Sequence, residues 1–478
     1  VGEKRFGEWL SGNVDWNISR DRYWGTPLPF WVCAGCEHVE ALDSLTEVNR
    51  RGKLLEEDGS LGDRPPTLSD PHKPGIDGVG LSCPACGGVL RRTPVVLDCW
   101  FDSGAMPYAQ YGWPHAPGSR ERVREQFPAD FICEGLDQTR GWFYTLHALG
   151  SFVSTLHEEG LAGEEPAYRT CLVNGLVLDR DGVKMSKRLG NVIDPWEMVA
   201  AHGADAVRWY LLASAAPWLP KRVDPAGIGE VRRRLFSTLA NSYQFFREYA
   251  RLDGFDPRSD EAPPPERWNE IDRWLYSRTQ SLSGEVRRRL EGLDLTGAAR
   301  AIETFVVDEL SNWYIRRNRR RFWKGETGPD KLAAFAALHQ ALRTAALVIA
   351  PFAPFLAEML WRRLEPEAGS VHAQPFPEPE VDHVDPDLER AMTLVQELVV
   401  MGRALREKAG LRVRQPLRAM HVRSSDPEAL RLLEGGFATS QVLDELNVKA
   451  WGSLGADDGR LCRLSGKANF KLLGKRLG

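Results

Sequence analysis

The stretch GVKMSKRLGN, residues 182–191, gathers three cations in a short segment bounded by two glycines. Lys184, Lys187 and Arg188 could close over a phosphate chain, because ammonium groups on a flexible loop stabilise the charge that develops when a triphosphate reacts. The two glycines allow the backbone to bend without strain. On composition alone, a solvated basic turn is the simpler explanation of the stretch.

Two CxxC pairs form a second candidate site, Cys33-Ala-Gly-Cys36 and Cys83-Pro-Ala-Cys86. Each pair places two thiols on a tight turn, and two such turns complete a sulfur tetrahedron for Zn²⁺. Four thiolates leave no open coordination position, so the zinc would be structural. The segment between the pairs is longer than in a short zinc ribbon, and four unrelated free thiols are the alternative. The spacing favours zinc or a former zinc site.

A third candidate lies at residues 310–325, which carry six cations and no acid. The cations are Arg316, Arg317, Arg319, Arg320, Arg321 and Lys324, and Trp313, Tyr314, Phe322 and Trp323 are interleaved with them. Phosphate contacts combined with stacking on unpaired bases are typical of proteins that hold single-stranded RNA loops. A packed helix explains part of the pattern, because Trp313 falls on an apolar stripe.

The bulk composition limits the class of protein. The 478 residues suggest about three domains, and 42% hydrophobic with 27% charged residues is ordinary for a globular chain. The net charge of −4 means that any nucleic-acid contact must use local basic patches. No run approaches the roughly 18 apolar residues of a membrane span, and the N-terminus has no apolar signal core. We expect a cytoplasmic protein without a membrane contact.

The elements that must position these residues follow from the periodicity. Strand-prone runs at 129–135 and 169–178 flank a helix candidate at 138–156, and this order predicts a parallel α/β sheet. Another helix begins at Asp194-Pro195. From about residue 228 the chain is mostly helical, with apolar stripes at three- and four-residue steps. The stripes are Ile302, Val306, Leu310 and Trp313, then Phe335, Leu338, Leu342, Ala345 and Ile349.

Several strings resemble class I aminoacyl-tRNA synthetases. KMSKR followed by LGN resembles their mobile ATP loop, whose usual form has Ser where this chain has Arg188. EGLDQTRGWFYTL (134–146) resembles the isoleucyl-tRNA synthetase segment that cradles the aminoacyl-adenylate. The other matching strings are DWNISRDRYWGTPLPFW (15–31, the re-entry into the core after the editing insertion), LSNWYIRRNRRRFW (310–323, the anticodon-binding domain), RVRQPL (412–417) and ELNVK (445–449).

The resemblance is closest to the eukaryote-like, zinc-containing branch of the isoleucyl enzymes. It implies an α/β plus all-α protein, in which the second half of a Rossmann-like parallel-sheet core carries a zinc-bearing insertion and precedes a helical-bundle anticodon-binding domain. The implied segments are 1–31 (core re-entry), 32–93 (zinc-bearing insertion), 94–215 (second half of the core, with the KMSKR loop), 216–262 (helical connecting region), 263–410 (anticodon-binding domain) and 411–478 (start of a C-terminal module).

The activity implied by the resemblance is that of an isoleucine–tRNA ligase. Such an enzyme activates L-isoleucine with ATP to isoleucyl-adenylate and transfers it to the 3′ end of tRNA(Ile), with Mg²⁺ accompanying the ATP. The resemblance also implies a monomer. A leucyl- or valyl-tRNA synthetase is the alternative within the class. A zinc-containing tRNA-binding protein without catalysis is the alternative outside it.

The resemblance assigns roles to individual residues. Lys184, Ser186 and Lys187 would be catalytic, with Lys187 stabilising the release of pyrophosphate. ATP would be bound by Asn174, Gly175, Val177, Met185 and Lys187. The aminoacyl-adenylate would contact Glu134, Gly135, Asp137 and Gln138, since carboxylates accept hydrogen bonds from an ammonium or from ribose hydroxyls.

The remaining roles concern specificity, RNA and metal. Trp100 and Trp142 resemble the aromatic walls of the isoleucine pocket, although plain core packing also explains a tryptophan. Arg316, Arg317, Arg319, Arg320 and Arg321 would contact the tRNA. Cys33, Cys36, Cys83 and Cys86 would hold the zinc.

Two features of the family are not found in the sequence. No His-x-Gly-His motif occurs, and the threonine-rich editing insertion is missing. The family also normally continues past the last residues, KANFKLLGKRLG. We therefore expect a chain truncated at both ends, which by itself shows negligible isoleucine-dependent ATP–pyrophosphate exchange.

Overall fold

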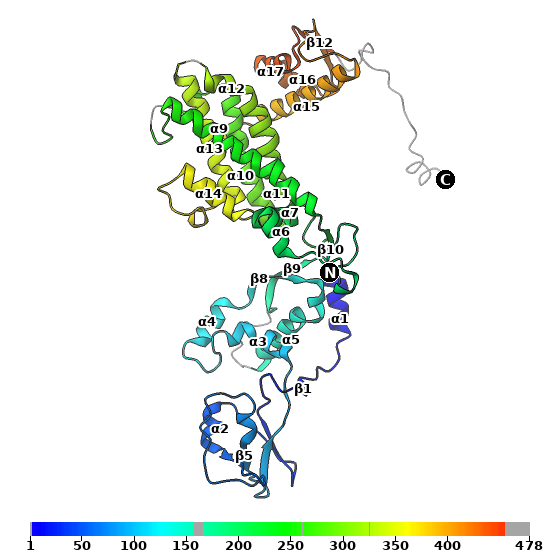
Figure 1. Cartoon of the computed structure of the whole chain (residues 1–478), viewed down its shortest axis with the longest axis vertical. Coiled ribbons are helices and arrows are strands. Elements are labelled where there is room, and N and C mark those ends of the chain that lie inside the picture. The colour runs from blue at the N-terminus through cyan, green and yellow to red at the C-terminus, as the bar shows by residue number, and fades with distance from the viewer. Residues whose placement is uncertain (1, 157–165, 260–261, 325, 455–478) are drawn as a thin grey trace, which may run out of the picture. The chain divides into compact units, whose positions relative to one another are not determined.

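The computed structural model describes residues 2–156, 166–259, 262–324 and 326–454 (Figure 1). The chain divides into two compact units. The first holds residues 1–176 with 217–220, and the second holds 177–216 with 221–478. Part of the expected C-terminal module, residues 455–478, lies outside the described residues.

An antiparallel five-stranded sheet in the first unit frames the two cysteine pairs, with strand order β3-β2-β6-β5-β4. Alternation along β2 turns Trp31 and Cys33 into the core, and the Trp31 indole donates to the Val79 carbonyl at 2.8 Å. The elements are β2 (Phe30–Cys33), β3 (Val39–Ala41), α2 (Leu45–Arg51), β4 (Lys53–Leu54), η2 (Gly75–Gly78), β5 (Val79–Ser82) and β6 (Val89–Arg92).

The rest of the first unit contains the predicted strand, helix and strand. Strands β8 (Ala129–Gly135) and β9 (Tyr168–Asn174) pair in parallel, with Gly135 opposite Asn174, and α5 (Trp142–Leu156) lies between them in the chain. The parallel α/β prediction is therefore confirmed. The other elements are η1 (Gly2–Phe6), α1 (Gly7–Ser11), β1 (Ser19–Arg20), β7 (Val96–Leu97), α3 (Cys99–Ala109), α4 (Ser119–Gln126) and η3 (Leu136–Arg140).

The second unit begins with a small parallel pair, β10 (Val177–Leu178) beside β11 (Lys221–Arg222). Between these strands lie η4 (Lys187–Leu189), α6 (Pro195–His202) and α7 (Ala204–Ala213). As predicted, a helix begins at Asp194-Pro195, and the Asp194 side chain accepts the N–H of Trp196 at 2.8 Å. Gly203 ends that helix, because its φ of 88° is outside helical geometry, and α7 starts afresh.

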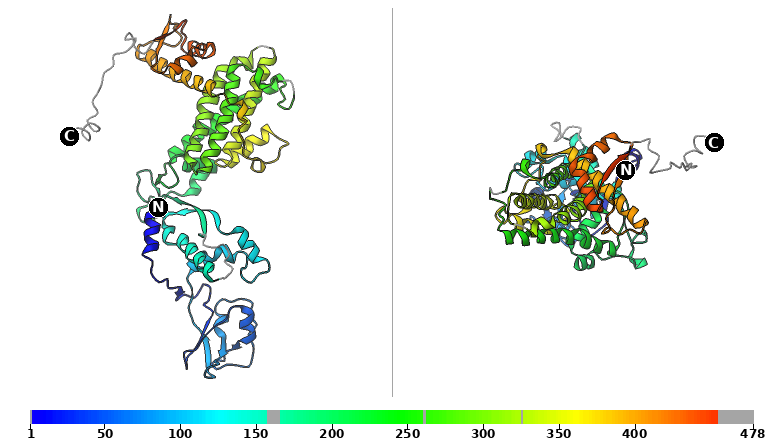
Figure 2. Two further views of the ribbon diagram at one scale, coloured as in Figure 1. Left: turned by 180° about the vertical axis from the view of Figure 1, so that it is seen from behind. Right: turned by 90° about the horizontal axis from the view of Figure 1, so that it is seen from above.

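Long helices then form a bundle that both views in Figure 2 show. Ile302, Val306 and Leu310 have no exposed surface, so the predicted stripe is the core face. The elements are α8 (Pro225–Val231), η5 (Arg232–Phe236), α9 (Ser237–Asp253), η6 (Pro265–Arg267), α10 (Glu270–Glu291), α11 (Leu295–Thr304), η7 (Phe305–Ile315), α12 (Arg316–Trp323), α13 (Pro329–Ile349), α14 (Pro354–Leu364), η8 (Val371–Ala373), η9 (Val381–His383) and α15 (Pro386–Lys408).

Helix α13 is the central helix of this bundle. Its 21 residues are long and apolar enough to cross a membrane by composition, yet 78% of its most apolar window is buried inside the protein. Phe335, Leu338 and Leu342 from the second predicted stripe have no exposed surface. The apolar character of α13 therefore reflects a position in the core.

A small mixed module follows α15. Strand β12 (Met420–Arg423) pairs in parallel with β13 (Trp451–Leu454). Helices α16 (Pro427–Glu434) and α17 (Gly436–Leu446) lie between these strands in the chain and bury Leu432, Leu433 and Val442 in the same core as α15.

Candidate functional site

The basic loop is a closed turn braced by two polar side chains. Asp179 accepts the N–H of Val183 at 2.8 Å, and its second oxygen accepts the Asn191 amide N–H at 2.8 Å. The Asn191 oxygen in turn accepts the N–H of Ser186 at 2.9 Å. Hydrogen bonds from Asn191 and then from Val183 lower the pKa of Asp179, so the carboxylate that holds the turn stays ionised.

The braced turn presents its cations to solvent. Lys184, Lys187 and Arg188 are exposed, and within the described part of the chain none of them forms an ion pair. Gly182 and Gly190 have φ values of 85° and 66°, which explains why glycine stands at both ends of the loop. The loop therefore offers three uncompensated positive charges on a defined backbone, which suits a polyphosphate.

Met185 attaches the loop to an apolar cluster. Its side chain is partly buried in a cluster with Ile193, Met198 and Leu211. Ser186 caps η4 by accepting the N–H of Leu189 at 3.3 Å. Their contacts with ATP stay a prediction.

The segment expected to cradle the adenylate lies where β8 ends and η3 begins. Glu134 and Asp137 are exposed. The Gln138 amide donates to Asp137 at 2.9 Å, and its oxygen accepts the N–H of Trp142 at 2.9 Å. A side chain on Gly135 would meet the Asp137 carboxylate at 2.6 Å, so a larger residue there would displace the Asp137 side chain. The structure thus brings two exposed carboxylates and one oriented amide to the carboxyl end of a parallel strand.

The two tryptophans expected in the amino-acid pocket meet at the same place. A Cβ on Gly141 would lie 3.2 Å from the Trp100 ring, so this indole rests against the backbone directly before Trp142. Trp142 donates from its indole to the Ser103 carbonyl of α3 at 3.1 Å. Trp100 is 39% exposed, as a wall of a binding site requires. Trp142 is therefore fixed by two hydrogen bonds, one of them to Gln138, and Trp100 lies against Gly141.

Asp98 is a residue of this site that sequence reasoning missed. Its buried carboxylate caps α3 by accepting the N–H of Trp100 at 3.2 Å, and it also accepts the Trp16 indole N–H at 3.0 Å and pairs with Arg20. It thereby ties the segment at 15–31 to the helix that carries Trp100. An aspartate directly before a helix is a recognisable capping signal that would have found it.

The three residues predicted to lie near adenine have different surroundings. The Asn174 amide donates to the Cys133 sulfur at 3.2 Å, so this side chain is engaged within the sheet. Gly175 donates its N–H to the Pro217 carbonyl at 2.9 Å, and a Cβ there would lie 2.4 Å from the backbone of Leu219. Val177 is 48% exposed and begins β10 in the second unit. Only glycine fits at 175, whereas adenine binding by all three stays a prediction.

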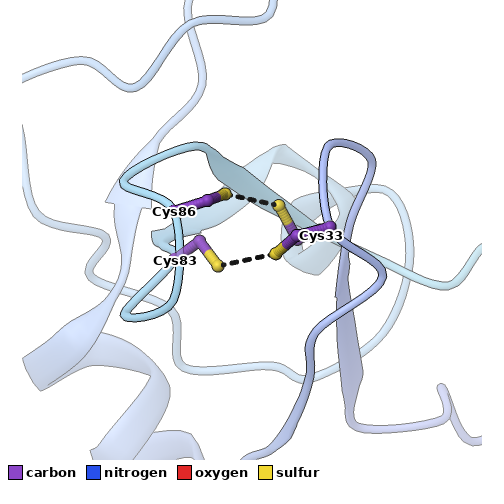
Figure 3. Close-up of side chains that lie close together, drawn as sticks. Cys33, Cys83 and Cys86 are labelled. Atoms are coloured by element: carbon purple, nitrogen blue, oxygen red, sulfur yellow. Dashed lines mark hydrogen bonds between the residues drawn. The ribbon is translucent and has the colours of Figure 1, made fainter.

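The four cysteines converge on one point. Figure 3 shows the sulfurs of Cys33, Cys83 and Cys86 turned toward one another across two facing turns. The Cys33–Cys86 and Cys36–Cys83 sulfur pairs are each 3.5 Å apart, and all four sulfurs lie within 4.8 Å of one another. Zn–S bonds of about 2.3 Å in a tetrahedron require sulfurs about 3.8 Å apart. The observed spacing fits a zinc ion.

The two cysteine turns have matching backbones. In the first, the Cys33 N–H donates to the His38 carbonyl at 2.9 Å, and in the second the Cys83 N–H donates to the Gly88 carbonyl at 2.7 Å. Glu37 and Gly87 occupy equivalent positions with φ of 59° and 75°. The Gly35 N–H lowers the pKa of the Cys33 thiol to about 7, whereas the pKa values of the neighbouring Cys36 and Cys86 thiols are raised by the other cysteines of the cluster. The donor set and its turns thus suit structural zinc.

The five arginines expected to contact tRNA separate into two groups. Arg316 and Arg317 pair with Glu445 of α17. Arg321 pairs with Asp272, which has no exposed surface, and with Asp330. These three arginines therefore hold α12 against its neighbours.

The other group consists of Arg319 and Arg320. Both are exposed, and among the described residues neither forms an ion pair. Trp323 on the same helix is 48% exposed. Contact of these exposed side chains with tRNA stays a prediction.

Sequence comparisons assign the chain to a family. A profile described as tRNA synthetases class I (I, L, M and V) matches residues 1–218, and a second, the anticodon-binding domain of tRNA ligase, matches residues 272–421. The chain belongs to the class I tRNA synthetases. The predicted fold, a Rossmann-like synthetase core followed by a helical anticodon-binding domain, is confirmed.

Curated relatives within this synthetase class match over the whole chain. The chain is 45% identical over 485 residues to the isoleucine–tRNA ligase of Thermus thermophilus and 42% identical over 495 residues to that of Porphyromonas gingivalis. Both matches cover 100% of this chain but only 44% and 42% of the relatives. The chain thus spans less than half the length of the curated relatives it matches.

A solved synthetase shares the fold. The agnB2 LeuRS of Agrobacterium radiobacter K84, crystallised in a ternary complex with tRNA and LeuAMS, is 25% identical with a TM-score of 0.59. That match covers 78% of this chain and 43% of the other. The structural likeness therefore extends over most of this chain.

Proposed function

We propose that this chain is part of an isoleucine–tRNA ligase, which activates L-isoleucine with ATP and transfers it to the 3′ end of tRNA(Ile). The observation that carries the proposal is the braced loop with Lys184, Lys187 and Arg188 exposed and without counter-ions among the described residues. A triphosphate supplies the missing negative charge, and Lys187 stabilises the pyrophosphate as it leaves. ATP would bind with Mg²⁺, which neutralises part of the phosphate charge.

Isoleucine is proposed as the substrate on two grounds. Two relatives at 45% and 42% identity are isoleucine–tRNA ligases, whereas the leucyl enzyme of similar fold is 25% identical. Trp100 and Trp142 offer a rigid apolar wall, which suits a branched aliphatic side chain. Glu134 and Asp137 would then accept hydrogen bonds from the α-ammonium or from ribose hydroxyls. Such a wall discriminates weakly against valine, because one methylene is worth only about 1–3 kcal/mol.

The RNA surface proposed for tRNA(Ile) is the exposed face of α12. Arg319 and Arg320 would neutralise phosphates, and Trp323 would stack on an unpaired base. Arg316, Arg317 and Arg321 would contribute by fixing the orientation of the helix. Cys33, Cys36, Cys83 and Cys86 would hold a structural Zn²⁺ that stabilises the insertion of the core. Within this proposal the protein acts in the cytoplasm, where charged tRNA is used, and as a monomer.

An exchange assay tests the proposed activity. A chimera would join the N-terminal part of the Thermus thermophilus relative, up to the residue aligned with Val1, to this chain. We expect isoleucine-dependent exchange of pyrophosphate into ATP, and loss of roughly 100-fold in activity with Lys187→Ala. Exchange that prefers leucine or valine would reassign the substrate, and a folded chimera without exchange for any of the three amino acids would favour the non-catalytic binding protein.

A binding assay tests the proposed RNA partner on the chain as it stands. Fluorescence anisotropy with labelled tRNA(Ile), tRNA(Leu) and tRNA(Val) transcripts is expected to show the tightest binding for tRNA(Ile). Arg320→Ala should weaken binding and lower the number of counter-ions released on binding by about one, which is measured as a smaller slope of log affinity against log salt concentration. Equal affinity for the three transcripts would contradict the assignment to isoleucine.

A further inference from the structure

Trp16 lies between the two helices that carry the walls of the proposed amino-acid pocket. Its ring packs against Phe101 of α3, with ring centroids 6.2 Å apart and planes inclined at 38°. It also packs against Tyr144 of α5, with centroids 6.2 Å apart and an angle of 60°. Phe101 directly follows Trp100, and Tyr144 stands two residues after Trp142. A single side chain therefore touches both helices close to the two tryptophan walls.

The buried Asp98 carboxylate fixes the direction of the Trp16 indole. One of its oxygens accepts the indole N–H at 3.0 Å and pairs with Arg20, while the other accepts the Trp100 N–H at 3.2 Å. Burial by itself raises the pKa of the Asp98 carboxyl, but the hydrogen bonds that it accepts and the charge of Arg20 outweigh burial, so the pKa is lowered. An ionised carboxylate accepts hydrogen bonds and donates none, so it holds the Trp16 ring in one orientation.

Helices α3 and α5 also touch each other directly. A Cβ on Gly104 would lie 2.7 Å from the Thr145 carbonyl oxygen, so the two backbones approach closely there. A single crossing point fixes the distance between two helices but not the angle between them, whereas a second support fixes the angle. Trp16 supplies a second support, because Phe101 precedes Gly104 by three residues, nearly one helical turn.

We propose that Trp16 and Asp98 are positioning residues that set the spacing between Trp100 and Trp142, and through it the preference for isoleucine over valine. This inference rests on the proposed function, since it takes the two tryptophans as the pocket walls. Isoleucine and valine differ by one methylene, which a wall senses only when it fits closely. A looser wall loses its contact with that methylene and keeps its contacts with the rest of the side chain, so selectivity falls while the reaction continues.

Asp98→Asn is the sharpest test variant, because it keeps the shape of the side chain. Its amide oxygen can still accept the Trp100 N–H, whereas its NH₂ group faces the Trp16 indole, which is also a donor. Trp16→Phe is a second variant, which keeps a ring between α3 and α5 but removes the hydrogen bond to Asp98. Asp130→Asn is the matched control, since it makes the same chemical change in a side chain of β8 that is 90% exposed.

Hydrogen exchange followed by mass spectrometry tests the support on this chain. In Asp98→Asn and Trp16→Phe, we expect the amides of α3 and of the first turns of α5 to exchange roughly threefold faster than in the control. The amides of β9 should stay unchanged, which separates loosening of the two helices from unfolding of the unit. Equal exchange of α3 and α5 in the variants and the control would overturn the positioning role.

ATP–pyrophosphate exchange by the chimera with the Thermus thermophilus relative tests the consequence for the substrate. We expect both variants to raise KM for isoleucine roughly tenfold, while KM for ATP stays within about twofold of the control. The ratio of kcat/KM for isoleucine to that for valine should fall about fivefold.

A structural role alone would lower kcat for both amino acids and leave this ratio unchanged, and that result would overturn the role in specificity. If the chimera with the unchanged chain activates no amino acid, the proposed function fails and the role in specificity falls with it. Hydrogen exchange then still decides whether Trp16 and Asp98 hold the two helices.

Discussion

Replacing Arg321 should destabilise the helical unit, although Arg321 belongs to the arginine-rich segment predicted to contact tRNA. Arg321 donates to both oxygens of Asp272, at 2.9 Å and 2.7 Å, and Asp272 has no exposed surface. Arg321→Met leaves that carboxylate buried without its cation. Breaking a buried pair in this way costs about 3–5 kcal/mol. Since 20% of the Arg321 side chain is exposed, we expect the lower end, about 3 kcal/mol.

The assay is urea unfolding monitored by circular dichroism, with Arg320→Met as the matched control one residue away. Arg320 is exposed, so its replacement should cost less than about 0.5 kcal/mol. For a unit of roughly 300 residues, 3 kcal/mol corresponds to a drop in melting temperature of about 5 °C. If Arg321→Met and Arg320→Met have the same stability, the buried pair does not hold α12 and the reasoning fails.

The pH dependence of the same variant provides a second check. Burial raises the pKa of the Asp272 carboxyl, and the hydrogen bond and charge of Arg321 oppose that shift. Removing Arg321 raises the pKa further. When the pKa of a carboxyl is raised in the folded state, the free energy of unfolding is highest below the unfolded pKa of about 4. It falls as the pH rises through the pKa of the folded state. The cost of Arg321→Met should therefore be larger at pH 7.5 than at pH 5, and a cost that is larger at pH 5 would contradict this account.

Three further predictions concern other parts of the chain. Burial, and then the charge of Arg343, lowers the pKa of His339 to about 4, so its contribution to stability is present above pH 6.5 and lost toward pH 4. In urea unfolding, His339→Leu should therefore reduce the fall in the free energy of unfolding between pH 6.5 and pH 4 by up to about 3 kcal/mol. An unchanged pH profile would refute this. Elemental analysis should find one zinc per chain and none in Cys83→Ser, and zinc bound equally by that variant would contradict the four-sulfur site. Asn191→Ala should lower ATP–pyrophosphate exchange by the chimera roughly tenfold, because the loop loses about 1.4 kcal/mol of hydrogen bonding. The melting temperature should stay unchanged, and full activity would show that these hydrogen bonds are dispensable.

The sequence by itself determined the class of the protein and most of its local structure. The alternation of strand, helix and strand over 129–178 predicted a parallel pair, because side-chain patterning and turn residues act locally. The apolar stripe through Ile302, Val306 and Leu310 predicted a core face for the same reason. The two CxxC pairs predicted a convergence of thiols, which the structure shows with sulfurs 3.5 Å apart.

Only the tertiary structure decided which charges are available for ligands. In the sequence, the arginines from 316 to 321 look equivalent, yet Glu445 and Asp272, far away along the chain, engage three of them and leave Arg319 and Arg320 exposed. The hydrogen bonds from Asn191 to Asp179 and from Thr296 to the Leu212 carbonyl of α7 likewise join residues that periodicity does not connect. An ion pair depends on where two side chains meet in space, so composition can show that a cation is present and only packing shows whether it is free to bind.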